Sequence, residues 1–134
     1  LVIIYMIIKK NTINTCIFSL SEKTTLTPVY YLFELTNVID KSITLFTATD
    51  ISNNKPSYNE FLIEETESID LLNGKINLPL IGSYTYKVFE QSSNTNLIVA
   101  NSGSEVDNGK IDLIEDAEVV PSFTDTRTIK VFNG

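Results

Sequence analysis

Short runs of alternating or β-branched residues recur along almost the whole chain, separated by clusters of Asn, Asp, Ser, Gly and Pro. Alternation with a period of two places every second side chain on one face of a β-strand. No window shows the spacing of three and four residues that a helix requires. The pattern predicts strands over residues 6–9, 13–20, 29–36, 42–48, 58–64, 69–72, 75–80, 83–90, 97–100 and 110–114. The chain is therefore expected to be all-β.

Three segments between these runs carry distinct turn signals. Residues 49–57 are dense in Asp, Asn, Ser and Pro and predict the longest loop. Asn73-Gly74 is the dipeptide that two-residue hairpins favour, and Asp107-Asn108-Gly109 predicts a further turn into the last of these strands. Pro79 cannot donate to a ladder, so its strand is expected at a sheet edge.

Many short strands without crossover helices favour an antiparallel β-sandwich, and a closed barrel is the alternative. One local pattern bears on this choice. Gly82-Ser83-Tyr84-Thr85-Tyr86 resembles the corner before strand F of immunoglobulin-like and fibronectin-like sandwiches, where a tyrosine hydroxyl bonds to upstream backbone. Tyr84 would be that tyrosine. Tyr86 would take the place of the second immunoglobulin cysteine, and Cys16 would lie on a strand suited to the first; the alternative is that both tyrosines are ordinary sheet aromatics.

The first eight residues form an unbroken apolar run that Lys9 and Lys10 close. A run of this length is too short for a membrane span, which needs about 20 residues. It also lacks the basic region and the small-residue cleavage site of a secretory signal. Translation from Met6 would make residues 1–5 non-native, and that alternative stays open.

The composition narrows the possible chemistry of this 134-residue, 15.0 kDa chain, whose length suits one main domain. A net charge of −7 repels phosphate backbones, so we expect no nucleic-acid partner. The chain has no histidine, which excludes a Ser-His-Asp centre and His-ligated metals. Its one cysteine excludes an internal disulfide and a Cys-rich zinc site.

The remaining candidate chemistry is weak. Carboxylates cluster at 64–70 and 105–118, but nothing in the sequence indicates a cleft between them, so a solvated acidic face is the preferred interpretation. Residues 107–109 lack the ligand spacing of a calcium loop. Cys16 on an apolar strand is expected to fill the core. The glycines match no phosphate-binding spacing. We therefore expect no enzymatic activity, no cofactor and no metal.

Residues 21–37, 58–61 and 82–90 together give the chain a family resemblance. They resemble small β-sandwich virion proteins of tailed phages that infect Bacteroidetes, crAss-like phages included. The similarity covers residues 6–114. It implies a structural protein that decorates or cements the capsid or belongs to a head fibre. It also implies capsid or other virion proteins as partners, a multi-copy or homo-oligomeric assembly, and a location in the virion after assembly in the bacterial cytoplasm.

The C-terminal part departs from this resemblance. We divide the chain into a β-sandwich domain, residues 1–114, and an acidic linker with a terminal strand or arm, residues 115–134. Residues 126–132 alternate with a period of two, and Ile129, Val131 and Phe132 are its apolar members. Such a strand could pair with the edge of a neighbouring copy. The alternative is an ordinary last strand of the same domain.

Two other functions remain open. A host-surface polysaccharide-binding module would use the loop residues Tyr30, Asn53, Asn54 and Tyr58. An accessory domain of a carbohydrate-active enzyme or peptidase is disfavoured because the chain contains neither histidine nor tryptophan.

Overall fold

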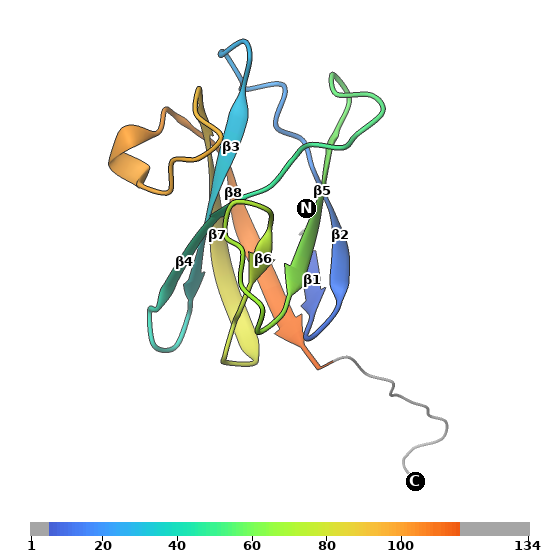
Figure 1. Cartoon of the computed structure of the whole chain (residues 1–134), viewed down its shortest axis with the longest axis vertical. Helices are drawn as coiled ribbons and strands as arrows, with labels where there is room; N and C mark the ends of the chain where they lie inside the picture. Colours follow the sequence, from blue (N-terminus) through green and yellow to red (C-terminus); the bar gives the residue numbers. More distant parts are fainter. Residues whose placement is uncertain (1–5, 116–134) are drawn as a thin grey trace, which may run out of the picture.

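The computed structural model describes residues 6–115, which form eight strands and one short 3₁₀ helix (Figure 1). The elements are β1 (Met6–Lys9), β2 (Ile13–Phe18), β3 (Tyr30–Asn37), β4 (Ile43–Thr47), β5 (Asn59–Glu65), β6 (Lys75–Ile76), β7 (Gly82–Gln91), η1 (Val99–Asn101) and β8 (Glu105–Ile114). The prediction of an all-β chain is confirmed.

The strands form two sheets, one with the order β1-β8-β7-β3-β4 and one with the order β2-β5-β6. Both sheets are mixed, because β1 runs parallel to β8 and β5 runs parallel to β6. The expectation of purely antiparallel sheets is therefore wrong at these two pairs. For β1 the reason is that the turn at residues 10–12 carries the chain from one sheet to the other instead of closing a hairpin. β1 is left to pair with the last strand.

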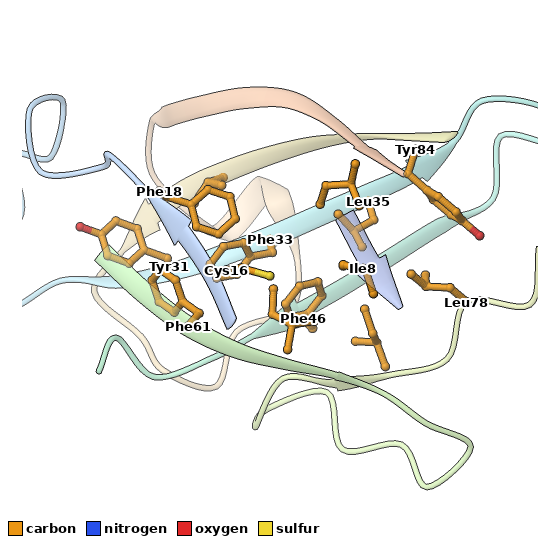
Figure 2. Close-up of a cluster of buried hydrophobic side chains, with 14 of the residues drawn as sticks. Ile8, Cys16, Phe18, Tyr31, Phe33, Leu35, Phe46, Phe61, Leu78 and Tyr84 are labelled. Carbon is orange, nitrogen blue, oxygen red and sulfur yellow. The ribbon is translucent and has the colours of Figure 1, made fainter. Parts of the chain in front are cut away.

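The core lies between the two sheets and is rich in aromatic rings (Figure 2). Phe33 of β3 stacks on Phe46 of β4 with centroids 5.0 Å apart, and it meets Phe61 of β5 edge-to-face at 4.9 Å. Such pairs contribute about 0.5–1.5 kcal/mol beyond the area they bury. The Phe33–Phe61 contact joins the two sheets without a disulfide.

Cys16 and Tyr86, which the sequence places at the two cysteine positions of an immunoglobulin domain, do not contact each other as the main link between the sheets. Cys16 is buried on β2, a strand that packs toward β7, as expected. The ring that meets Tyr86, however, belongs to Phe18, two residues further along β2, at 5.4 Å and edge-to-face. Phe18 also lies 5.5 Å from Phe33. A ring cluster therefore connects the sheets at the place where an immunoglobulin domain has its disulfide.

Some predicted boundaries are wrong. Residues 97–100 do not form a strand, since η1 occupies 99–101. Of the predicted strand 75–80, only Lys75 and Ile76 pair in a sheet. The predicted strand 69–72 is instead a turn over residues 71–74, next to the isolated bridge Asp70↔Lys75. Residues 107–109 lie inside β8 and form no turn. Gly109 sits opposite Tyr86 in the ladder, and a Cβ on it would come within 2.7 Å of that ring. Glycine is used here to make room for an aromatic side chain.

Candidate functional site

A groove opens between β2 and β8, and we call it the β2–β8 groove. It has a volume of about 540 Å³ and is lined by Met6, Thr15, Ile17, Phe18, Ser19, Tyr86, Asp107 and Asn108. Phe18 is 4% exposed, so its ring belongs to both the core and the groove. The lining is therefore apolar at depth and polar where Asp107 and Asn108 lie.

Both strands that border this groove have an unpaired edge among the described residues. β1 covers β8 only at residues 111–114, which leaves 105–110 without a neighbour on that side. Within residues 6–115, β2 pairs with β5 alone, so its other edge has no strand neighbour there. An open strand edge is a template for another extended chain.

The direction of the free backbone groups on β2 follows from the bonds of β5. The Glu64 amide donates to Gly74 at 2.8 Å, and the Glu60 carbonyl accepts from Ile51 at 2.8 Å, so both residues turn their backbone groups away from β2. In an antiparallel ladder their partners, Ile13 and Ile17, must then point away from β5. Thr15 lies between them and has the same direction. Three residues thus present N–H and C=O groups outward.

The outer face of the same sheet carries exposed apolar side chains. Ile13 is 63%, Ile17 56% and Leu62 45% exposed. Glu60 and Glu64 lie on this face too, since they are the ladder partners of Ile17 and Ile13. An apolar strip with carboxylates beside it is chemically suited to a strand with apolar and basic side chains.

Tyr86 and Asp107 set the electrostatics of the groove. The Tyr86 hydroxyl donates to Asp107 Oδ2 at 3.1 Å. Burial and the neighbouring carboxylate raise the pKa of Tyr86, so the hydroxyl stays protonated. Asp107 is the charged residue among those that line the groove, and no lysine or arginine lines it. The groove is therefore weakly acidic.

A second cavity of about 310 Å³, the loop pocket, lies at the end of β3 and β4. It is lined by Val29, Tyr30, Tyr31, Thr47, Ala48, Thr49, Asp50, Lys55, Leu72, Asn73 and Asn94. Desolvation would raise the pKa of Asp50, but bonds from Asn59, Ser52 and Glu60 outweigh it and lower the pKa. Asp50 is therefore held as a structural carboxylate, and the groups left to meet a ligand include the Tyr30 ring and the neutral Asn73 and Asn94 amides.

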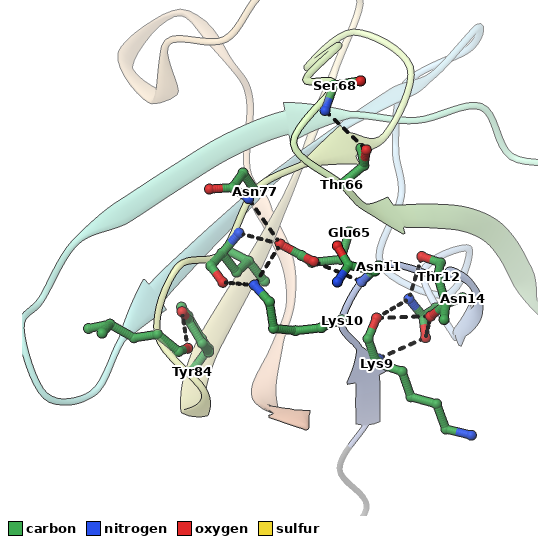
Figure 3. A network of polar contacts seen from close by, with 12 residues as sticks. Lys9, Lys10, Asn11, Thr12, Asn14, Glu65, Thr66, Ser68, Asn77 and Tyr84 are labelled. Atoms are coloured by element: carbon green, nitrogen blue, oxygen red, sulfur yellow. Dashed lines mark hydrogen bonds and ion pairs between the residues drawn. The ribbon is translucent and has the colours of Figure 1, made fainter. Parts of the chain in front are cut away.

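Two carboxylates, Glu65 and Glu90, are buried, and for Glu65 the interpretation of residues 64–70 as a solvated acidic face is wrong. Glu65 is 0% exposed and accepts bonds from Asn11 N at 2.9 Å, Leu78 N at 2.9 Å and Lys10 Nζ at 3.3 Å (Figure 3). It ties the β1–β2 turn to β5. Glu90 accepts bonds from the Thr25 amide and hydroxyl and from the Leu26 amide. Both carboxylates are occupied by donors within the fold.

Tyr84 lies at the start of β7 with its ring in the core (Figure 2). Its hydroxyl donates to the Leu80 carbonyl at 2.7 Å, which is the upstream backbone bond expected of a tyrosine corner. The assembly candidates Ile129, Val131 and Phe132 lie outside the described residues, as does the acidic linker beyond Glu115.

The other sequence candidates are not brought together into a site. Burial raises the pKa of the Cys16 thiol to about 12, so this thiol is a poor nucleophile. Across residues 6–115, no group of three or more Cys, Asp or Glu side chains is arranged to hold a metal ion. Of the loop residues considered for polysaccharide, Tyr30 lines the loop pocket, whereas Asn53, Asn54 and Tyr58 do not.

Comparisons with protein-family models, with curated proteins and with solved structures found no match for this chain. Within the described part of the chain, no helix is long and apolar enough to span a membrane.

Proposed function

We propose that this protein is a non-enzymatic structural module, an immunoglobulin-like β-sandwich that is built into a larger assembly through its strand edges. The observation that carries the proposal is the outward-facing backbone of Ile13, Thr15 and Ile17 beside the β2–β8 groove. An open strand edge binds an extended chain through main-chain hydrogen bonds. A groove beside it, lined by the Phe18 and Tyr86 rings and by polar side chains, can accept every second side chain of that chain.

Two features support the immunoglobulin-like topology. The Tyr84 hydroxyl bonds to backbone four residues upstream at the start of β7. β2 and β5 pair on one layer while β3, β7 and β8 are neighbours on the other, which is the division of strands B, E and C, F, G in that fold. The parallel β1–β8 and β5–β6 pairs are additions to a purely antiparallel arrangement.

The assembly we propose is a virion. This rests on the resemblance of residues 6–114 to small β-sandwich phage proteins, and it makes the protein a capsid-decorating, cementing or head-fibre component. A passive role is supported by the state of the reactive groups, since Glu65, Glu90 and Asp50 are held by internal donors.

The experiment is a mass-spectrometric count of this chain in purified particles, followed by add-back of the recombinant protein to particles that lack it. We expect a fixed, multi-copy stoichiometry and saturable rebinding. Absence from particles, or turnover of a candidate substrate by the purified chain, would refute the proposal.

The loop pocket favours one second candidate, a module that binds a host-surface polysaccharide. An exposed tyrosine, 39% accessible, lies beside neutral amide side chains in a cavity near the lower size limit of small-molecule sites. A glycan array tests this: Tyr30→Ala should abolish binding, while Tyr58→Ala, which changes a tyrosine outside the pocket, should not. Equal binding by both variants would exclude the loop pocket.

A further inference from the structure

We propose that the free edge of β2 accepts residues 126–132 of a second copy as an added strand, which closes the β2–β8 groove. The inference rests on the proposed assembly function and names the contact that would join copies of the chain.

The acceptor edge is β2 because, among the described residues, β4 and β6 are shorter and the open part of β8 is continuous with β1. At the five-residue strand β4, the Thr47 amide donates to Leu71 at 2.8 Å and the Thr47 hydroxyl donates to Leu72 at 3.2 Å, so one end of this shorter edge is engaged. The open part of β8, residues 105–110, continues the line of β1. β2 offers six consecutive residues, about the length of a seven-residue donor strand.

The donor segment fits this edge in pattern and in charge. Residues 126–132 alternate, so Ile129 and Val131 share one face, and the other face carries Lys130 and Phe132. The segment contains Arg127 and Lys130 and no acidic residue, in a chain whose net charge is −7. The acceptor region carries Asp107 in the groove and Glu60 on the flanking sheet face, where Glu64 already pairs with Lys75 at 3.8 Å. The opposite charges of the donor and of the surface around the β2 edge favour their association.

The length of the connection allows the transfer. β8 ends at Ile114, whose carbonyl accepts from the Lys10 amide at 2.9 Å, beside the turn that leads into β2. The eleven residues 115–125 can span up to about 36 Å when fully extended, so the donor segment need not stay next to the end of β8.

The binding test uses a chain that lacks residues 119–134 and a synthetic peptide of the same residues. Among the residues that the structure describes, the buried core lies between Ile8 and Leu113, so this shortened chain keeps all of it. Circular dichroism checks its fold. We expect saturable binding of the peptide by calorimetry.

Paired variants locate the contact. Thr15→Pro in the acceptor removes one outward N–H without touching the β5 ladder, and it should weaken binding about tenfold or more through the lost bond and the ring's bulk. Thr15→Val keeps the N–H and should bind like the parent. In the peptide, Ile129→Asp with Val131→Asp should abolish binding, whereas Asn133→Asp should not.

Several results would overturn the inference. They are no binding by a folded acceptor, equal binding to the Thr15→Pro acceptor, or binding that appears only after residues 1–5 are also removed, which would mean that those residues fill the groove. Sedimentation of the full chain gives the last criterion, since donation between copies requires oligomers that grow with concentration. A chain that stays monomeric yet is counted in particles would refute strand donation and leave the proposed function standing.

Discussion

Removing the Glu65 carboxylate tests how the β1–β2 turn, and with it the edge of β2, is held in place. Glu65 ends β5, is fully buried and receives the Leu78 and Asn11 amides at 2.9 Å (Figure 3). Lys10 Nζ lies 3.3 Å away and also donates to the Leu78 carbonyl at 3.0 Å. Glu65→Ala leaves these donors without their acceptor.

The expected loss can be worked from these contacts. The buried Leu78 amide loses its partner at about 1–3 kcal/mol, and the part-buried Asn11 amide adds less because water can reach it. Breaking a buried ion pair costs about 3–5 kcal/mol, but the Lys10 side chain is 20% exposed and keeps a carbonyl acceptor, which places this pair at the low end. We expect Glu65→Ala to lower the free energy of unfolding by about 3 kcal/mol.

Urea unfolding measured by far-UV circular dichroism suits this chain, since it has no tryptophan to follow by fluorescence. Glu65→Gln keeps the shape and one acceptor oxygen and should lose about half as much. Lys10→Met removes the cation alone, and a double-mutant cycle with Glu65→Gln isolates the coupling between the two side chains. A loss of stability below about 1 kcal/mol for Glu65→Ala, with an unchanged urea slope, would refute the idea that Glu65 holds the β1–β2 turn in place.

Three further predictions concern other parts of the fold. Tyr84→Phe removes the hydroxyl that bonds to the carbonyl four residues upstream, and it should cost about 1 kcal/mol in thermal or urea unfolding; no change would mean that the bond is not stabilising. Gly109→Ala should cost about 1–3 kcal/mol because its Cβ would displace the Tyr86 ring, and the loss should shrink in a Tyr86→Ala background; an additive loss would argue against that clash. Burial alone would raise the pKa of Glu90, yet the bonds from Thr25 and Leu26 outweigh it and lower the pKa from 4.5. The unfolded chain then binds this proton more readily, so the stabilisation is present above pH 4.5 and is lost as the pH falls through the lower folded value. The stability difference between the parent and Glu90→Gln should accordingly be larger at pH 6 than at pH 3; a difference independent of pH would refute this role.

Local patterns predicted local features well. Strand positions followed from alternation, as at 43–47 and 59–65, because a half-buried strand needs apolar residues on one face. The Tyr84 bond involves residues only four apart, so a five-residue pattern was enough to suggest it.

Features that depend on distant partners were harder to predict. A period of two gives a strand's faces but neither its neighbour nor its direction, so the parallel β1–β8 pair could not be inferred. Gly109 carries a turn signal in the sequence, but its reason is the Tyr86 ring on another strand. The β2–β8 groove exists because β1 covers only four residues of β8, and that register is a property of the assembled sheets.

The reactivity of Cys16 can report how often the protein opens at β2. It is the only thiol in the chain, it is 1% exposed on β2, and its raised pKa of about 12 keeps it unreactive while the fold is closed. Alkylation of native protein must therefore wait for β2 to separate from its neighbours, and the labelling rate measures how often that happens. A strand bound along β2 would lower the rate of Cys16 alkylation. The same rate, measured without and with the partner, therefore reports both the opening of the sandwich and the binding of the strand.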